Sequence, residues 1–338
     1  MKGISVALVG LVVMAGTAAA SLPVSPASGA VTGSASRALG APDGWASQKN
    51  PDYNTKHDIS AVACTSATNC TATGYSTLAT TTGGRAWAYQ TGSLDYYLAG
   101  VSCPSANTCY ASGEKGAVVT TADAGASWRP LQSRTTHYLN AISCPDARTC
   151  YAVGDGGGTI AATINGGQLW RGQHNPLTGS KHILFGVSCS SVTTCVSVGW
   201  LVMRTTDGGA TWTEQNNPDN EMLAVTCPDK QTCYAVGDKG TIMTSTDGGA
   251  HWTTQTSGTT NSLDGVACAG ARVCYAVGDK GTIVATSDGG STWSRQASGT
   301  TRNLRGVSCA KSGACYAVGE RGTILKSPST AVGAPSAA

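Results

Sequence analysis

Residues 262–297 read SLDGVACAGARVCYAVGDKGTIVATSDGGSTWSRQA, and they contain four short apolar segments separated by glycine-rich turns. The apolar segments cover 263–268, 274–277, 282–286 and 292–296. The intervening sequences AGAR, GDKG and SDGG are rich in residues that favour chain reversal. Short apolar runs bounded by such turns predict four successive antiparallel strands.

The same pattern recurs seven times, and each copy carries one C-x5-C pair. The first cysteines of successive pairs lie 39, 41, 45, 38, 41 and 41 residues apart. A four-stranded repeat of this length is typical of a propeller blade. The sequence therefore predicts an all-β fold, a seven-bladed β-propeller of four-stranded blades over residues 41–328.

The last repeat ends without its fourth strand, and a matching strand stands at the other end of the chain. Residues 45–48 read WASQ, which matches WTTQ at 252–255 and WSRQ at 293–296. We therefore expect the N-terminal strand to complete the last blade and to close the ring through backbone hydrogen bonds. Closure of this kind leaves few exposed strand edges.

The first twenty residues, MKGISVALVGLVVMAGTAAA, have the pattern of a secretory signal. A lysine precedes an apolar run, and small residues follow it, which predicts a signal peptide at 1–20 and a secreted protein. The alternative is a membrane anchor, but the run is shorter than the ~20 residues of a membrane span. We expect no membrane span after cleavage. Residues 21–40 are expected to form a flexible leader and residues 329–338 a flexible tail.

Fourteen cysteines favour an oxidising compartment. The spacing leaves two interpretations, zinc ligands or disulfides within each repeat, and structural zinc sites usually have cysteines two to four residues apart. We therefore predict seven disulfides and no metal, with the pairs Cys64–Cys70, Cys103–Cys109, Cys144–Cys150, Cys189–Cys195, Cys227–Cys233, Cys268–Cys274 and Cys309–Cys315. A net charge of +3 without a basic run argues against nucleic acid as a partner.

A second recurring element is the turn before each tryptophan, for example TTDGGATW at 205–212 and TSDGGSTW at 286–293. These turns resemble the Asp-box of sialidases and related propellers with BNR repeats. The whole repeat, with its VGDKGTI segment, is similar to the seven-bladed photosystem II stability/assembly-factor-like propellers. This resemblance covers nearly all of 41–328, and it implies the propeller fold.

We interpret the residues of these turns as structural. An aspartate can accept backbone N–H groups across a turn, and a tryptophan can bury a large apolar area over the blade. The residues concerned are Asp123, Trp128, Asn165, Trp170, Asp207, Trp212, Asp247, Trp252, Asp288 and Trp293. We expect neither a metal nor another cofactor at these positions.

Sialidase chemistry is not expected, because the Phe/Tyr-Arg-Ile-Pro motif of that family is missing. The only Arg-Pro pair is Arg129-Pro130, and the single Phe185 precedes a glycine. The sequence also lacks a G-x-S-x-G or H-E-x-x-H motif and a cysteine left over as a nucleophile. We therefore name no catalytic residue and expect binding rather than catalysis.

Two connections between blades match one another. Residues 48–57 read QKNPDYNTKH and residues 173–182 read QHNPLTGSKH, and both precede a blade whose shortened turn carries an aromatic residue. Because both features belong to the face opposite the cysteine loops, we predict two related binding pockets, formed by Asn50, Lys56, His57, Tyr75, Asn175, Lys181, His182 and Trp200. The alternative is a past duplication that left similar loops without a function. Further candidates for contacts with a partner are Asp95, Tyr96, Tyr97, His137, Tyr138, 217–219 and Glu221.

An aromatic ring with a polar rim suits a sugar. Our main hypothesis is therefore a secreted, non-catalytic module that recognises a glycan or another cell-surface ligand. Other secreted proteins are alternative partners, in which case the chain is a scaffold subunit of an exported assembly. A glycoside hydrolase or lyase is the second alternative.

Overall fold

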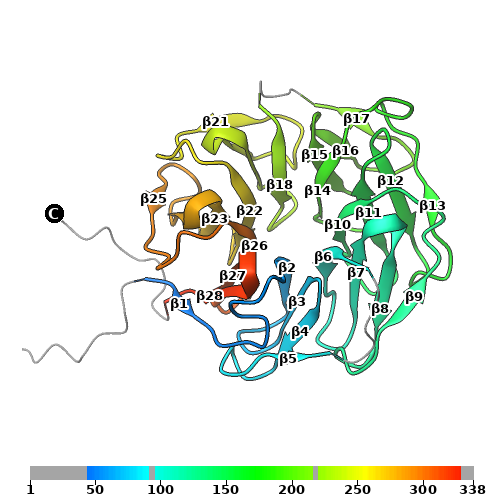
Figure 1. The fold of residues 1–338 in the computed structure, drawn as a ribbon. Coiled ribbons are helices and arrows are strands. Elements are labelled where there is room, and N and C mark those ends of the chain that lie inside the picture. Colours follow the sequence, from blue (N-terminus) through cyan, green and yellow to red (C-terminus); the bar gives the residue numbers. More distant parts are fainter. Residues whose placement is uncertain (1–43, 91–95, 216–219, 329–338) are drawn as a thin grey trace, which may run out of the picture. The chain divides into compact units, whose positions relative to one another are not determined.

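The computed structural model describes residues 44–90, 96–215 and 220–328. These residues form seven four-stranded antiparallel sheets arranged in a ring (Figure 1). No α-helix occurs in this part of the chain. The predicted all-β, seven-bladed propeller is therefore confirmed. The predicted signal peptide, leader and tail lie outside the described residues.

Within blades 1 to 6 the strands follow chain order from the channel outward. Blades 1 and 2 comprise β2 (Ile59–Cys64), β3 (Cys70–Gly74), β4 (Thr77–Thr80), β5 (Ala88–Tyr89), β6 (Leu98–Ser102), β7 (Cys109–Gly113), β8 (Val118–Thr121) and β9 (Arg129–Leu131). Blades 3 and 4 comprise β10 (Leu139–Ser143), β11 (Cys150–Gly154), β12 (Thr159–Thr163), β13 (Arg171–Gly172), β14 (Leu184–Cys189), β15 (Cys195–Gly199), β16 (Met203–Thr205) and β17 (Thr213–Glu214). Blades 5 and 6 comprise β18 (Met222–Thr226), β19 (Cys233–Gly237), β20 (Ile242–Ser245), β21 (Thr253–Gln255), β22 (Leu263–Cys268), β23 (Cys274–Gly278), β24 (Thr282–Thr286) and β25 (Ser294–Arg295).

Blade 7 is built from both ends of the propeller. Its inner strands are β26 (Leu304–Cys309), β27 (Cys315–Gly319) and β28 (Thr323–Lys326), and its outer strand is β1 (Ala46–Ser47). Ala46 pairs with Lys326 in antiparallel register. Beside this strand, Trp45 is buried and meets the ring of Tyr275 edge-on, with 5.3 Å between the ring centroids. The predicted closure of the ring is confirmed.

The core lies between neighbouring blades. The second strand of each blade is buried along its whole length, as in the CYAVG segments of β11 and β19. Tyrosines on these strands also join one blade to the next. The Tyr151 hydroxyl donates to the Val192 carbonyl at 2.9 Å, and the Tyr234 hydroxyl donates to the Ala271 carbonyl at 2.8 Å. Each blade thus buries its apolar surface against its neighbour, which a single repeat could not do alone.

All seven predicted disulfides are present, and each joins the first two strands of its own blade. Seven such bonds indicate an oxidising, extracellular environment. In the described ranges, no group of three or more histidine, cysteine, aspartate or glutamate residues is placed to hold a metal ion. No helix within the same ranges has the length and apolar character needed to cross a membrane.

The turns between the third and fourth strands are held by side-chain hydrogen bonds. The Asp123 carboxylate accepts from the Ser127 N–H at 2.9 Å and from the Thr121 hydroxyl at 2.7 Å. In the matching turn of blade 3, the Asn165 side-chain oxygen accepts from the Leu169 N–H at 3.0 Å. These turns also bond to the cysteine loops, because the Gly166 N–H donates to the Arg148 carbonyl. Both sets of loops therefore occupy the same end of the propeller.

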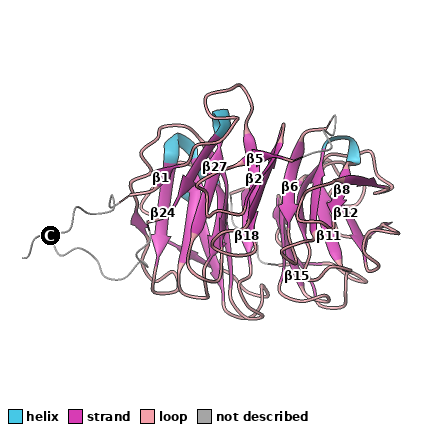
Figure 2. Ribbon diagram, turned by 90° about the horizontal axis from the view of Figure 1, so that it is seen from below, coloured by secondary structure: helices cyan, strands magenta, loops and turns pink. Residues whose placement is uncertain are grey.

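The opposite end carries the second-to-third-strand turns and the connections between blades, and we call it the loop face. Four of its turns are short 3-10 turns, namely η1 (Glu114–Gly116), η2 (Asp238–Gly240), η3 (Asp279–Gly281) and η4 (Glu320–Gly322). Figure 2 shows these turns gathered at one end of the propeller. This end is where a binding site was predicted.

Candidate functional site

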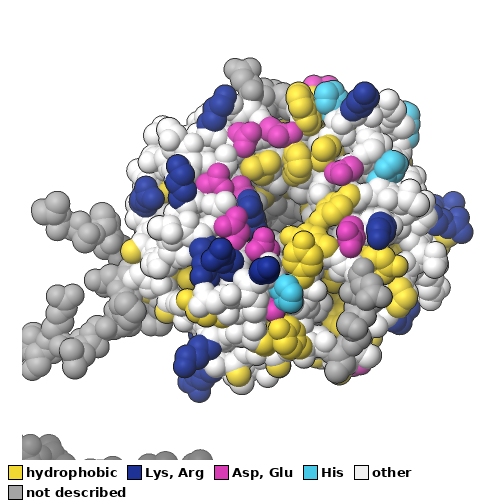
Figure 3. All heavy atoms as spheres, in the orientation of Figure 1, with side chains coloured by type: hydrophobic (Ala, Val, Ile, Leu, Met, Phe, Trp, Pro, Cys, Tyr) yellow, Lys and Arg dark blue, Asp and Glu magenta, His cyan; other side chains and the backbone are white. Residues whose placement is uncertain are grey.

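The 3-10 turns give the loop face a regular pattern of charge. Each has an acidic residue followed by a lysine or arginine in the left-handed region, for example Lys239 with φ 55°. The N–H of the acidic residue donates to a backbone carbonyl just before the first strand, as Asp238 does to Glu221 at 3.0 Å. In the space-filling view, acidic side chains gather around the central hollow, and most basic side chains lie farther out (Figure 3).

The glycine that precedes each 3-10 turn is required for close packing. Gly113 has extended backbone, yet a Cβ atom there would lie 2.0 Å from the Tyr97 carbonyl oxygen. The turn therefore packs directly on the backbone of the connection that enters the same blade. The glycine before the turn is thus required for space, whereas Gly116, which ends the same turn, has a positive φ of 71°.

Seven residues in equivalent positions line the mouth of the channel. The first strand of each blade has a bulge, which turns one extra side chain toward the central cavity of about 200 Å³. The bulged residues are Ser60, Ala99, Asn140, Phe185, Leu223, Asp264 and Arg305. The mouth is consequently asymmetric, since blades 4 and 5 contribute apolar side chains and blades 6 and 7 an ion pair.

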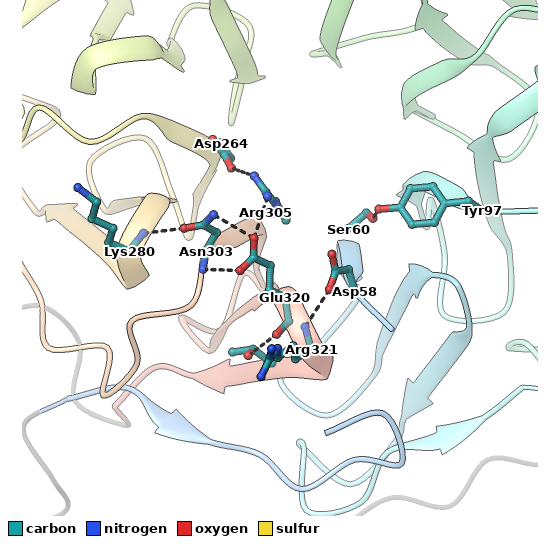
Figure 4. Close-up of polar contacts among 10 residues, drawn as sticks. Asp58, Ser60, Tyr97, Asp264, Lys280, Asn303, Arg305, Glu320 and Arg321 are labelled. Atoms are coloured by element: carbon teal, nitrogen blue, oxygen red, sulfur yellow. Dashed lines mark hydrogen bonds and ion pairs between the residues drawn. The ribbon is translucent and has the colours of Figure 1, made fainter. Parts of the chain in front are cut away.

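The ion pair belongs to a larger polar network (Figure 4). Arg305 donates to Asp264 at 2.8 Å and to Glu320 at 3.0 Å, so one cation serves two carboxylates. The pKa of Asp264 is raised to about 6, mainly by burial and in part by the nearby Asp279 and Asp238, although Arg305 lowers it.

The rest of this side of the mouth is also negative. Burial raises the pKa of Glu221, and the neighbouring Asp238 adds to the effect. Within the described ranges, Asp58, Glu221, Asp238 and Asp279 form no ion pair. Their carboxylates therefore add negative charge to the loop face without forming ion pairs within the described ranges.

The opposite side of the mouth is aromatic. The rings of Tyr75 and Tyr97 meet edge-on with centroids 4.8 Å apart. Tyr97 in turn contacts the Ser60 hydroxyl, and burial raises the pKa of Tyr97 (Figure 4). Burial also raises the pKa of Tyr138, and Tyr97 contributes to this increase. Aromatic and acidic surfaces thus meet across one opening.

The structure places each predicted aromatic residue beside the predicted histidine. The ring centroids of His57 and Tyr75 are 5.9 Å apart, and those of His182 and Trp200 are 4.8 Å apart. Tyr75 is 62% exposed and Trp200 is 57% exposed. Each matched connection therefore does bring a histidine to the shortened turn of the blade that it enters.

The two predicted asparagines have a different position. Asn175 is only 3% exposed, and its amide donates to the Gly158 carbonyl at 2.8 Å while its oxygen accepts from Leu177. Asn50 bonds in the same way to the Gly322 carbonyl at 2.9 Å. Both asparagines thus attach a connection to the turn of the preceding blade. Lys56 and Lys181 are exposed.

Sequence reasoning missed a buried carboxylate in the first of these connections. Asp52 is 1% exposed and accepts from three side chains, the His57 ring at 3.1 Å, the Ser76 hydroxyl at 2.6 Å and the Tyr89 hydroxyl at 2.8 Å. The carboxylate bonds to Nδ1 of His57, which leaves Nε2 as the other ring nitrogen for a ligand. Because the Asp52 contact also fixes the ring beside Tyr75, Asp52 is a positioning residue.

The second connection lacks this network. The positions matched to Asp52 and Ser76 by the offset of 125 residues are Leu177 and Leu201, and both leucines pack in the apolar core of blade 4. The signal was available in the sequence, because the two connections differ in residue type at these two positions. Both matched loops thus hold a histidine beside an aromatic ring, but the first rests on a buried polar network and the second on apolar packing.

Comparisons with known proteins support the fold. Residues 173–304 match a family model described as the DUF6242 beta propeller domain, which is less than half of the chain. No curated protein matches the sequence. Among solved structures, the chain is similar to YCF48 bound to D1 peptide, with 18% identity and a TM-score of 0.69 over 86% of this chain and 97% of that chain.

Two further structures have the same fold. YCF48 from Cyanidioschyzon merolae is 16% identical, with a TM-score of 0.67 over 84% of this chain and 98% of that chain. The WD40 beta propeller domain of Doa1 is 10% identical, with a TM-score of 0.70 over 85% of this chain and 98% of that chain. At these identities the likeness shows the fold alone. The chain is a seven-bladed β-propeller, similar in architecture to YCF48 and to the propeller of Doa1.

Proposed function

We propose that this protein is a secreted, non-catalytic module that docks a protein partner on its loop face. The observation that carries the proposal is the pair of exposed rings, Tyr75 and Trp200, each held beside a histidine on that face. Exposed aromatic side chains of this kind are frequent anchors of protein interfaces. The solved YCF48 structure holds a peptide, which supports a partner of the same class.

The chemistry of the channel mouth indicates what the partner presents. Its acidic side has several carboxylates around one arginine, and its other side has tyrosine rings with Phe185 and Leu223. A segment with a lysine or arginine next to an apolar side chain is complementary to both sides. The basic side chain of such a segment would pair with the carboxylates of the acidic side, and its apolar side chain would cover the apolar surface.

Export is part of this proposal. The seven disulfides are consistent with an oxidising compartment, and residues 1–20 have the pattern of a secretory signal. A scaffold subunit in an exported assembly would meet its partners outside the cytoplasm. The mass of the secreted chain would show whether cleavage follows Ala20.

The test uses immobilised peptides that differ only in charge beside an aromatic residue. We expect basic-aromatic peptides to bind more tightly than acidic-aromatic ones, and the Tyr75→Ala/Trp200→Ala variant to lose at least about tenfold in affinity. Ile164→Ala is the matched control, because Ile164 is 71% exposed but belongs to the turns at the opposite end. Unchanged binding in the double variant would refute the proposed face.

Glycan recognition is the second candidate function. It is favoured by the tilted packing of His182 on Trp200, next to the exposed Lys181, because a flat ring with a polar rim can hold a sugar. The same wild-type and variant proteins should be applied to a glycan array. A glycan signal lost in the double variant, together with no peptide binding, would replace the protein-docking proposal with this one.

A further inference from the structure

A large cavity of the loop face lies outside the channel mouth, over blades 2 and 3. Its volume is about 770 Å³, within the range of roughly 300–1,000 Å³ that is typical of ligand pockets. No residue of the described part of the chain lines both this cavity and the central cavity. A ligand here would therefore be separate from a partner at the channel mouth.

One wall of this cavity is bare backbone. Gly156, Gly157 and Gly158 line it, and all three have left-handed φ angles of 72°, 85° and 69°. A Cβ atom at Gly156 would lie 2.3 Å from Nδ1 of His137, and one at Gly158 would lie 2.6 Å from Cβ of Leu177. Close packing as well as backbone conformation thus requires the three glycines. The N–H groups of Gly156 and Gly157 have no hydrogen-bond partner within the described ranges.

The charged side chains that line the cavity are all basic or protonatable. They are Lys115, Arg134 and His137, and none of the lining residues that the structure describes carries a carboxylate. All three side chains are exposed, and none of them forms an ion pair with another described residue. The cavity therefore has unpaired cations next to free backbone amides, a combination that favours an anion.

We propose that this cavity binds an acidic saccharide. The cations and amides would hold a carboxylate or sulfate group of the sugar. Gln132, Gln173 and Thr135 also line the cavity and can bond to hydroxyl groups, and the partly exposed Tyr96 offers a ring face to a sugar. An acidic peptide has the same charge but lacks the hydroxyl groups that this polar lining would serve.

An equivalent groove over blades 5 and 6 provides an internal control. Its volume is about 630 Å³, and Lys239 lines it from the same turn position as Lys115, with φ 55° against 54°. Among the residues that the structure describes, neither a histidine nor an aromatic side chain lines this groove. Replacing Lys115 or Lys239 therefore has the same effect on the backbone. The two variants differ in whether the lost side chain lined the proposed saccharide site.

The experiment measures binding of tetragalacturonate and of its methyl ester to the full chain by calorimetry; the ester has the same sugar rings and hydroxyl groups but no negative charge. We expect the acid to bind at least about tenfold more tightly than the ester. Arg134→Gln and Lys115→Gln should each weaken the acid about tenfold, while Lys239→Gln changes it less than about twofold. Equal affinity of acid and ester, or no binding of the acid at millimolar concentration, would overturn the proposal.

A second variant blocks the cavity without removing a charge. Gly172 lines it, and a Cβ atom there meets nothing within 4 Å. The equivalent position of blade 1 is Tyr89, so a tyrosine is already compatible with this strand. Gly172→Tyr should abolish binding of tetragalacturonate and leave thermal unfolding unchanged. Retained binding would contradict the site.

Two further ligands identify the chemical class. Sodium sulfate tests whether an inorganic anion is sufficient, and hexaglutamate tests an acidic peptide. We expect both to bind at least about tenfold more weakly than tetragalacturonate, because they lack sugar hydroxyl groups. Equal affinity for either one would overturn the assignment to a saccharide. Neither result affects the peptide test at the channel mouth, which uses other residues.

Discussion

At the residue scale, the two matched connections show how one backbone arrangement can rest on different chemistry. Asp52 is buried and receives hydrogen bonds from His57, Ser76 and Tyr89, whereas Leu177 holds the same place in the apolar core of blade 4. A buried carboxylate is costly to desolvate, and the leucine shows that the fold does not need it. We conclude that Asp52 serves the position of His57 rather than stability.

This conclusion predicts the behaviour of a variant that copies blade 4 into blade 1. Asp52→Leu/Ser76→Leu should change the free energy of unfolding by less than about 1 kcal/mol or increase it, because apolar residues often replace buried polar groups without loss. Peptide binding should weaken, since His57 loses its fixed orientation beside Tyr75. Urea unfolding and peptide affinity measure the two effects. A severe loss of stability with unchanged binding would contradict the positioning role.

At the element scale, the turns at the end of the propeller opposite the loop face are held by exposed carboxylates with a lowered pKa. Hydrogen bonds from Ser127 and Thr121 lower the pKa of Asp123 to about 2, and the same kind of contact lowers the pKa of Asp207 and Asp288 to about 2. In an unfolded chain these groups would titrate near ~3.9. The unfolded state therefore binds more protons than the folded state between these values.

These carboxylates make the stability of the propeller depend on pH. Their contribution to the free energy of unfolding is fully present above about pH 4, and it is lost as the pH falls toward about 2. We expect the free energy of unfolding to decrease over this interval, and to decrease less in the variant Asp123→Asn/Asp207→Asn/Asp288→Asn. Asparagine is compatible with the turn, as Asn165 shows. Urea unfolding between pH 2 and 6 tests this, and parallel curves for the two proteins would refute it.

At the scale of the whole molecule, stability depends on closure of the ring by two distant segments. Trp45 and Trp87 are equally buried, and each packs edge-on against a tyrosine of the preceding blade, Tyr275 and Tyr316 respectively. Only Trp45 lies next to a strand that is not continuous with the rest of its blade. The two tryptophans therefore form a matched pair for a test of closure.

Both Trp45→Ala and Trp87→Ala should lower the free energy of unfolding by about 3–5 kcal/mol, the usual cost of deleting such a side chain. Only Trp45→Ala should also loosen β1 on β28, because β1 comes from the other end of the chain and joins its blade through strand pairing at Ala46 and Ser47 and the hydrogen bond from the Gln48 N–H to the Ile324 carbonyl. Hydrogen exchange at β28 should then increase in Trp45→Ala and stay unchanged in Trp87→Ala. Equal protection of β28 in the two variants would show that closure does not depend on Trp45.

The sequence predicted the fold in detail, because each of its signals is local. Cysteine spacing, strand length and turn residues repeat with one period, and a single repeat contains all of them. The outer strand of blade 7 was also predictable, since WASQ at 45–48 matches the other tryptophan strands. The fourth strands are shorter than expected, for example β25 (Ser294–Arg295) against a predicted 292–296, because only part of each segment pairs with its neighbour.

The candidate site was predictable only in part. His57, Tyr75, His182 and Trp200 could be found by comparing two copies of one loop, and the structure brings them together in pairs. The roles of Asn50 and Asn175 could not, because their hydrogen-bond partners are backbone atoms of a neighbouring blade. The charges of the channel mouth also belong to different blades, as Asp264 and Arg305 do.

The sequence by itself thus determined the number of blades, the disulfides and the closure of the ring, because these features depend on residues close in the chain or on a repeated pattern. The tertiary structure alone decided which side chains share a site. Ring closure places the first strands of all blades around one channel, and it brings Arg305 near carboxylates from other repeats. Distances between repeats are set by the packing of blades, and no local pattern in the sequence encodes them.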